Sequence, residues 1–375
     1  MRLPKVYFFV QPISKMGYQH NAIGMAQGMR ELGITFGANT DYWREADGNI
    51  LFKQDPALGP NDADILILTE QYLTYGDGKF PQAYFDAPGK KVFISTGDGM
   101  VMQKQMFKPI YKKFDLILTF IYEGIPYPKN FRPWAYGMTN HMISLSRPDL
   151  PKEDKICLNY RNSHSVRQRA KEWVFDKLDQ RRIDTTRETF DWEPLEHSKD
   201  FSEYVVWQSA GRHNEAYLDR IGRSLATSAF GGDFFIKPSI WGWYTWKFIN
   251  YFVESAASIG RMNNIAKKIG LHTDHTYRIY QWDSWRIWEA FAAKSMAVNV
   301  DFEKYRIRLP EMPVNFQHYL GVDLRNPQKA IDVLNDPEKM KEIGAAGYDW
   351  AMQHYAPKAL AQRLLRYVDD LKQEG

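Results

Sequence analysis

Two residues of opposite charge, Arg286 and Glu289, stand three positions apart in a segment with a helical pattern. This spacing places both side chains on one side of a helix, near its start. A carboxylate there can accept hydrogen bonds from two ribose hydroxyls, and a guanidinium can bind a phosphate through parallel hydrogen bonds. The alternative is an exposed ion pair of little energetic value. The pair therefore predicts either a nucleotide site or an ordinary surface contact.

Two further arginines follow an apolar run at residues 155–160. Arg161 lies in the loop directly after this run, and Arg167 lies near the start of the next predicted helix. A loop that follows a strand and leads into a helix N-terminus is a natural site for a diphosphate. Other basic residues lie close by in the sequence, so a plain basic surface is the alternative.

The first half of the chain contains two candidates for a general base. Asp98 stands between two glycines after the apolar run at residues 91–95. A carboxylate there could take the proton of an acceptor hydroxyl, or it could simply form a turn. The loop before the first predicted helix contains Gly17 and ends at His20, which could act as a base or simply begin the helix. Of the two, Asp98 is the stronger candidate.

Polar residues at two other places could face the same cleft. Glu123 follows the apolar run at residues 116–120. His213 and Asn214 precede a helical run, and they would either cap that helix or touch a bound sugar.

The segments that would position these residues fall into two halves. The first half predicts a helix over residues 20–32 and buried strands at residues 6–10, 64–68, 91–95 and 116–120. The second half predicts helices over residues 166–178 and 284–293, strands at residues 155–160, 224–230, 296–302 and 319–322, and a helical tail over residues 327–372 broken near Pro337 and Pro357. Strands that alternate with helices indicate parallel sheets, whose functional loops lie at the carboxyl ends of the strands.

Composition limits the class of protein. The length of 375 residues fits two α/β domains with a ligand cleft between them. Cys157 is the only cysteine, which excludes an internal disulfide and fits a reducing cytoplasm. No run of eighteen apolar residues occurs, so no transmembrane segment is predicted. The formal net charge of +4 is compatible with a polyanionic partner without requiring one.

Two acidic or histidine-containing motifs imitate metal sites. Asp62 and Asp64 form an Asp-x-Asp pair, but they precede their strand, which is the wrong end of a parallel sheet for chemistry. His272 and His275 lack the helical spacing of zinc ligands. No protein metal site is therefore predicted, although a divalent cation resting on a bound diphosphate would need few protein ligands.

The sequence RIWEAFAAKSMAV at residues 286–298 resembles the sugar-nucleotide helix of the GT-B glycosyltransferases. In that family the ribose is bound by a Glu that is followed by an Ala, a pair of small residues and an apolar strand. The resemblance therefore gives this role to Glu289. The family's usual second Glu, eight positions earlier, is Gln281 here, and Asp283 is the nearest acid. The resemblance implies an α/β fold of two Rossmann-like domains facing a cleft, with C-terminal helices packing back on the first domain.

The same resemblance divides the chain into three parts. It implies a Rossmann-like acceptor domain over residues 1–148, a nucleotide-sugar-binding domain over residues 149–350 and a C-terminal helix over residues 351–375. An aromatic insertion around residues 235–275 includes a Trp-rich stretch at residues 240–252, for which a buried or dimer-forming helix is the default interpretation.

Scattered motifs also resemble the phage DNA β-glucosyltransferases. These are Arg-aliphatic-Trp-Glu at residues 286–289, Asp-Phe-Glu at residues 301–303, the arginines after residue 160, and the strand that ends in Asp98. This resemblance implies that Arg161, Arg167 and Arg286 neutralise the leaving diphosphate, and that Asp98 is the general base if the enzyme inverts.

The expected function is therefore sugar transfer from a nucleotide sugar, with a UDP-sugar favoured and no tightly bound cofactor. The favoured acceptor is a hydroxymethylated base in phage DNA. A set of lysines after Asp98 could contact the DNA phosphates beside the site: Lys104, Lys108, Lys112 and Lys113. A solvated helix face explains those lysines equally well. The alternatives are a glycosyltransferase of surface polysaccharide or lipopolysaccharide synthesis, and a non-catalytic module that binds nucleotide sugars or nucleic acid.

Overall fold

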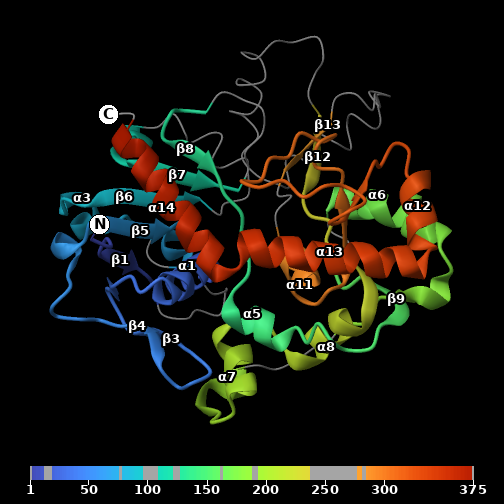
Figure 1. Cartoon of the computed structure of the whole chain (residues 1–375), viewed down its shortest axis with the longest axis horizontal. Helices are drawn as coiled ribbons and strands as arrows, with labels where there is room; N and C mark the ends of the chain where they lie inside the picture. Colours follow the sequence, from blue (N-terminus) through green and yellow to red (C-terminus); the bar gives the residue numbers. More distant parts are fainter. Residues whose placement is uncertain are drawn as a thin grey trace.

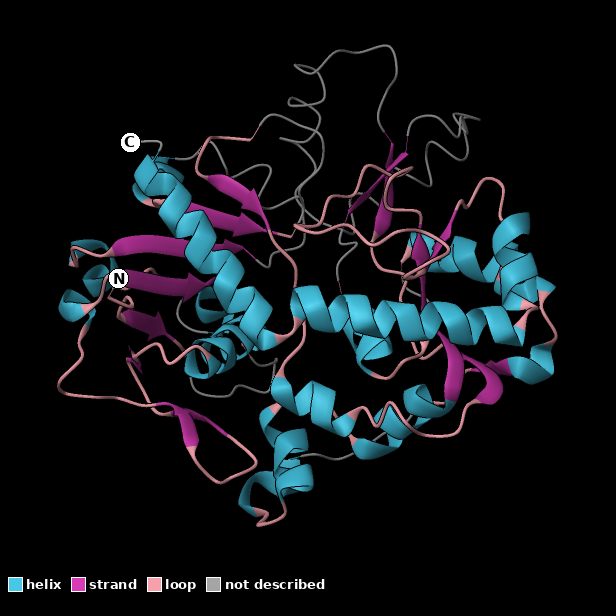
Figure 2. Ribbon diagram, in the orientation of Figure 1, coloured by secondary structure: helices cyan, strands magenta, loops and turns pink. Residues whose placement is uncertain are grey.

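The computed structural model of the chain contains two parallel β-sheets that lie side by side, with helices around them (Figures 1 and 2). It describes residues 2–11, 19–75, 78–95, 109–120, 127–160, 164–187, 193–236, 277–280 and 284–373. None of the helices in these ranges is long and apolar enough to cross a membrane.

The first sheet consists of six parallel strands in the order β2-β1-β5-β6-β7-β8. Their bounds are β1 (Val6–Phe9), β2 (Phe36–Ala38), β5 (Ile65–Thr69), β6 (Lys90–Ser95), β7 (Leu116–Thr119) and β8 (Phe131–Pro133). The four strands expected from the apolar runs are all present, and apart from the two lysines that begin β6 their side chains are buried on both faces of the sheet. A hairpin of β3 (Tyr42–Arg44) and β4 (Ile50–Phe52) was not expected, because three-residue strands carry almost no periodic signal.

The second sheet consists of five parallel strands in the order β10-β9-β11-β14-β15. Their bounds are β9 (Glu153–Cys157), β10 (Ile183–Asp184), β11 (Ser224–Ser228), β14 (Met296–Val300) and β15 (Leu320–Val322). A separate antiparallel pair is formed by β12 (Asp233–Ile236) and β13 (Tyr277–Tyr280). Cys157 at the end of β9 is fully buried, and burial raises the pKa of its thiol to about 11, as expected for a core thiol.

The helices connect the strands and cover the sheets. They are α1 (His20–Glu31), α2 (Glu70–Tyr75), α3 (Gln82–Asp86), α5 (Asn140–Leu145), α6 (Ser165–Trp173), α7 (Phe201–Gln208), α8 (Glu215–Arg223), α11 (Trp285–Ala292), α12 (Gln328–Leu334), α13 (Pro337–Tyr355) and α14 (Pro357–Gln373). Short 3-10 turns include η1 (Pro60–Asp62) and η2 (Pro109–Lys113). The predicted breaks in the tail are confirmed, since Pro337 and Pro357 are the first residues of α13 and α14, where a missing N–H costs nothing.

The last helix, α14, packs against α1 of the first sheet (Figure 1). The approach is close at Gly28, where a Cβ atom would lie 1.9 Å from the carbonyl oxygen of Pro357. The backbone N–H of Met138 also donates to the carbonyl of Tyr355, at 2.9 Å, just before the chain enters α14. The prediction that C-terminal helices return to the first half is confirmed.

The hairpin β3-β4 joins the first half to the second through α7. The side-chain amide of Gln208 pairs in both directions with the backbone of Arg44, at 3.1 and 2.8 Å, as a neighbouring strand would. The Arg44 guanidinium lies 3.5 Å from the ring centroid of Tyr204 on the same helix. These contacts tie the two halves together at the bottom of the view in Figure 1.

Candidate functional site

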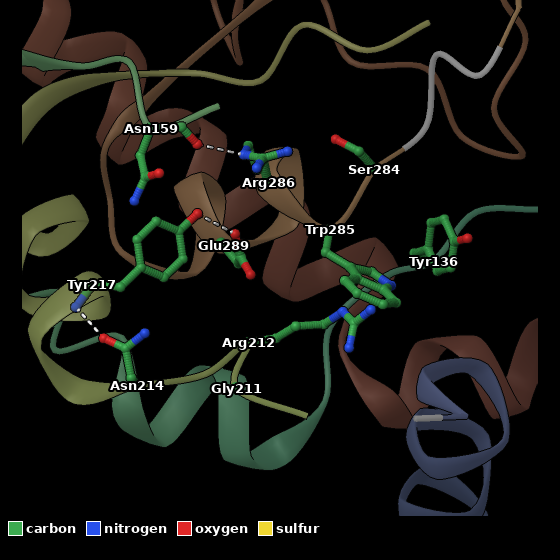
Figure 3. Close-up of a pocket in the computed structure, with 10 residues that line it drawn as sticks. All are labelled: Tyr136, Asn159, Gly211, Arg212, Asn214, Tyr217, Ser284, Trp285, Arg286 and Glu289. Carbon is green, nitrogen blue, oxygen red and sulfur yellow. Dashed lines mark hydrogen bonds between the residues drawn. The ribbon is translucent and has the colours of Figure 1, made fainter. Parts of the chain in front are cut away.

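A pocket of about 540 Å³ lies at the carboxyl edge of the second sheet, within the size range of small-molecule sites. It is lined by Tyr136, Asn159, Gly211, Arg212, Asn214, Tyr217, Ser284, Trp285, Arg286 and Glu289 (Figure 3). Most come from three places: the loop after β9, the segment that leads into α8, and the first turns of α11. Helices that follow parallel strands begin at the carboxyl edge, which is why these side chains meet there.

Helix α11 supplies three of the lining residues, Trp285, Arg286 and Glu289, and Ser284 precedes it as its N-cap. Its apolar face, with Ile287, Trp288 and Phe291, is buried, so the orientation of the helix is fixed by the core. Arg286 and Glu289 consequently face the same pocket. Glu289 is only 3% exposed, which excludes the alternative of an exposed surface ion pair.

The carboxylate of Glu289 is held by two residues from the start of α8. The hydroxyl of Tyr217 donates to Oε2 at 2.7 Å, and Nε2 of His213 lies 3.5 Å from Oε1. Burial acts to raise the pKa of Glu289, but the contacts with His213 and Tyr217 and the charge of Arg286 outweigh it, so the pKa lies below its ordinary value. The carboxylate is therefore ionised at neutral pH.

Arg286 and Arg212 give the pocket two positive side chains. The Nε of Arg286 donates to the carbonyl of Asn159 at 2.9 Å, which orients the guanidinium at the end of β9. The Arg212 guanidinium lies 4.6 Å from the ring centroid of Trp285. Together with the N-terminus of α11, these cations make the pocket suitable for an anion.

Asn214 begins α8 and caps it. Its side-chain oxygen accepts a hydrogen bond from the backbone N–H of Tyr217 at 2.8 Å. Of the two roles expected for this residue, the cap is confirmed. The cap also fixes the first turn of α8, and thus the position from which Tyr217 reaches Glu289.

His20, at the start of α1, lies between the two halves and is fully buried. Its Nε2 donates to the carbonyl of Gly137 at 2.9 Å, and its ring stacks on Trp285 with the centroids 6.0 Å apart. The pKa of His20 is lowered to about 3, mainly by burial and to a smaller extent by His213, while the bond to Gly137 and the charge of Glu289 act in the opposite direction. A histidine with this pKa is poorly matched to proton abstraction at neutral pH, and His20 does not line the pocket. These contacts fit a residue that packs the junction between the halves.

Arg167 lies on α6 beside the end of β11 and is 8% exposed. Its Nε donates to the carbonyl of Phe230 at 2.8 Å, and its guanidinium lies 5.3 Å from the ring centroid of Tyr160. It is not among the residues that line the pocket.

Several sequence candidates lie outside the described residues. They are Gly17, Asp98, Lys104, Lys108, Glu123, Arg161, residues 240–252, His272, His275, Gln281 and Asp283.

The remaining two lysines of the proposed DNA contact do not lie beside the pocket. Lys112 and Lys113 are the last residues of η2, and two residues separate η2 from the first residue of β7, Leu116. They therefore stand at the amino end of the first sheet, where Lys113 lies 5.4 Å from the ring centroid of Phe85. The carboxyl ends of the strands are at the opposite edge, so the expectation that these two lysines flank the site is wrong.

The described part of the chain contains no group of three or more His, Cys, Asp or Glu side chains placed to bind a metal ion. Asp62 accepts a hydrogen bond from the backbone N–H of Gly59, and Asp64 pairs with Arg2 and with the backbone N–H of Lys5. Both aspartates therefore have structural partners.

Two solved structures of an α-glucosyltransferase match the chain over its whole length. The structure in complex with UDP-glucose and DNA containing an abasic site has a TM-score of 0.50 and 9% identity, and the match covers 99% of this chain and 100% of that one. The structure in complex with UDP has the same TM-score and identity, over 98% and 100%. This chain has the GT-B fold.

A glycosyltransferase involved in avilamycin A biosynthesis also matches, with a TM-score of 0.47 and 12% identity over 99% of both chains. No protein-family model and no curated protein matches the sequence. The similarity is thus one of fold, and the GT-B arrangement expected from residues 286–298 is confirmed.

The sequence alone does not indicate the group that surrounds Glu289. Tyr217 and Arg212 carry no motif, and the pattern around His213 predicts only a helix cap or a sugar contact. Their one local signal is Asn214, since a helix cap at the carboxyl edge of a parallel sheet brings its flanking residues to the functional edge.

Proposed function

We propose that this chain is a glycosyltransferase that binds a UDP-sugar in the pocket at α11 and transfers the sugar to an acceptor hydroxyl. The observation that carries the proposal is the pairing of Arg286 and Glu289 in one pocket, beside the N-terminus of α11. A cation and a buried, ionised carboxylate one helical turn apart match the diphosphate and the ribose of a nucleotide sugar. The GT-B fold, shared with an α-glucosyltransferase solved with UDP-glucose, supports the same assignment.

In this proposal the main catalytic task is stabilisation of the leaving diphosphate. Arg286 and the N-terminus of α11 bind it, with Arg161 and Arg167 as further candidates, while Gly17 and Asp283 contribute to the donor site. A divalent cation on the diphosphate is part of the proposal, and transfer in the presence and absence of a chelator tests it.

Asp98 is proposed as the general base of an inverting transfer. The Asp98→Asn variant should lose most of its transfer activity while it still binds the donor. Undiminished transfer by this variant would remove Asp98 from that role, and the anomeric configuration of the product would show whether the reaction inverts.

For the acceptor we propose a hydroxymethylated base in DNA. The support is the fold shared with an α-glucosyltransferase solved on DNA, together with the net charge of +4. A glycan acceptor is the second candidate, and the position of Lys112 and Lys113 at the far edge of the first sheet favours it. Binding to DNA should weaken steeply as salt rises, whereas transfer to a glycan should change little.

The direct test is transfer of labelled sugar from a series of nucleotide sugars, with hydroxymethylated DNA, unmodified DNA and a polysaccharide as acceptors. Label on hydroxymethylated DNA alone would support the proposal. Slow donor hydrolysis without any acceptor would identify an enzyme whose acceptor is another molecule. Binding of the donor with neither transfer nor hydrolysis would identify a non-catalytic module.

A further inference from the structure

The carboxylate of Glu289 receives its hydrogen bonds from a different helix. Tyr217 is in the first turn of α8 and His213 directly precedes the cap of that helix, whereas Glu289 is on α11, more than seventy positions later. Both partners are buried, with exposures of 8% and 1%. The three side chains form one buried group, the Glu289 group, which reaches the pocket through Glu289 and Tyr217 (Figure 3).

The geometry leaves Glu289 half of its hydrogen-bonding capacity. An ionised carboxylate has about four acceptor positions, two on each oxygen. Tyr217 uses one on Oε2, and His213 lies at one on Oε1. One position therefore remains on each oxygen, which is the number needed to accept the 2′ and 3′ hydroxyls of a ribose.

The Glu289 group also restricts how the carboxylate can turn. A carboxylate bound at only one oxygen can rotate about its last torsion, whereas contacts to both oxygens from a neighbouring helix fix its plane. The cap at Asn214 holds the backbone of Tyr217, so the donor hydroxyl is itself fixed in position. A pre-oriented acceptor lowers the ordering cost of binding a diol.

We propose that Tyr217 and His213 are positioning residues that orient Glu289 toward the 2′ and 3′ hydroxyls of the donor, and so make the pocket selective for ribonucleotides over deoxyribonucleotides. The inference rests on the proposed function, because it concerns the ribose of the same donor. The inference adds a physical basis for the selectivity between ribose and deoxyribose. A polar site that hydrogen-bonds a ligand hydroxyl rejects an analogue without that hydroxyl, because the buried polar groups of the site are then left unpaired.

The opposing explanation is that Tyr217 and Glu289 only bind α8 to α11. In that case loss of the Tyr217 hydroxyl would loosen the whole pocket and weaken all nucleotides alike. The ratio of affinities for UDP and 2′-deoxy-UDP separates the two explanations, since a general loosening does not change it.

The experiment measures the affinity for UDP and for 2′-deoxy-UDP by titration calorimetry in four full-length proteins: wild type, Tyr217→Phe, His213→Gln and the control Tyr367→Phe. The control removes a hydroxyl from α14, where it donates to the carbonyl of Pro133. Circular dichroism and melting temperature verify that each protein is folded.

Wild type and control should prefer UDP by about tenfold or more. Tyr217→Phe should lose about tenfold in affinity for UDP and less than threefold for 2′-deoxy-UDP, and His213→Gln should shift the ratio in the same direction. If both variants weaken the two nucleotides equally, or leave both unchanged, the inference is overturned while the donor site stands. If the wild type binds neither nucleotide, the proposed function fails and the inference fails with it.

Discussion

The two halves of the chain contribute to the pocket in different ways. The second half supplies Arg286, Glu289 and Tyr217, polar groups that bind one another or the backbone around the cavity. The first half supplies Tyr136, and His20 lies behind it against Trp285. The residues proposed to bind the donor thus belong to the second half, while the described part of the first half contributes ring contacts beside the pocket, such as that between Tyr136 and Trp285.

This difference can be tested with matched substitutions. Changes at polar residues of the second half should reduce donor affinity, and changes in the packing of the first half should reduce stability without altering the affinity of the folded protein.

The largest effect is expected at Glu289. Glu289→Ala should reduce UDP affinity more than a hundredfold, and it should lower the free energy of unfolding by about 3 kcal/mol, because it leaves the hydroxyl of Tyr217 and the ring of His213 buried without their acceptor. Calorimetry and urea denaturation measure the two quantities. Glu338→Ala, at an exposed position of α13, is the control. UDP affinity within threefold of wild type would contradict the assignment of Glu289.

Arg286→Gln should reduce UDP affinity by tenfold to a hundredfold, the usual range for a hydrogen bond to a charged group. The variant should also show a weaker dependence of affinity on salt, because one cation at the phosphates is gone. The control is Arg366→Gln on the exposed side of α14, which should behave as wild type. An equal loss in both variants would show that net charge, and not the pocket, governs binding.

Gly28→Ala tests the packing of the first half. The new Cβ atom would lie 1.9 Å from the carbonyl oxygen of Pro357, so α1 and α14 must separate, at a cost of about 3 kcal/mol. UDP affinity of the folded variant should be unchanged. Gly59→Ala, where the Cβ would meet only Asp62 Oδ2 at 3.5 Å, should cost far less. Equal stability of the two variants would mean that α14 does not pack closely on α1.

His20 should make the stability depend on pH. The unfolded chain binds a proton at this histidine near pH 6.5, whereas the folded chain does so only at a pKa of about 3. The stability is therefore complete above pH 6.5 and falls as the pH drops toward 3, by about 2 kcal/mol at pH 5. In His20→Gln the loss of unfolding free energy between pH 7.5 and pH 5 should be smaller by about this amount. The exposed His197→Gln is the control, and an unchanged loss in His20→Gln would refute the burial of a neutral ring.

The sequence was informative where the signal is local. Apolar runs such as residues 64–68 and 116–120 located the strands, Asn214 was recognised as a possible cap, and the spacing of Arg286 and Glu289 placed them on one side of α11. Each of these rests on periodicity or on a contact within a few residues.

What could not be predicted depends on contacts between distant parts of the chain. Nothing near His213 or Tyr217 indicates that Glu289 lies against them, because the contact depends on how α8 and α11 pack on one sheet. The position of His20 in a loop suggested a base, but its burial results from Trp285 and Gly137 closing over it. Lys113 was expected beside the site because it is close to Asp98 in the sequence. The chain between the two residues crosses to the amino edge of the sheet, so closeness in sequence did not mean closeness in space.

We propose that the pocket around Arg286 and Glu289 binds the diphosphate and ribose of a nucleotide sugar. The most direct test is the melting temperature of wild type and of the double variant Arg286→Gln, Glu289→Gln across a panel of UDP-, GDP- and ADP-sugars. One UDP-sugar at a hundredfold excess over its dissociation constant should stabilise the wild type by about 2.7 kcal/mol, and it should not stabilise the double variant. No shift with any nucleotide sugar, or an equal shift in both proteins, would contradict the account.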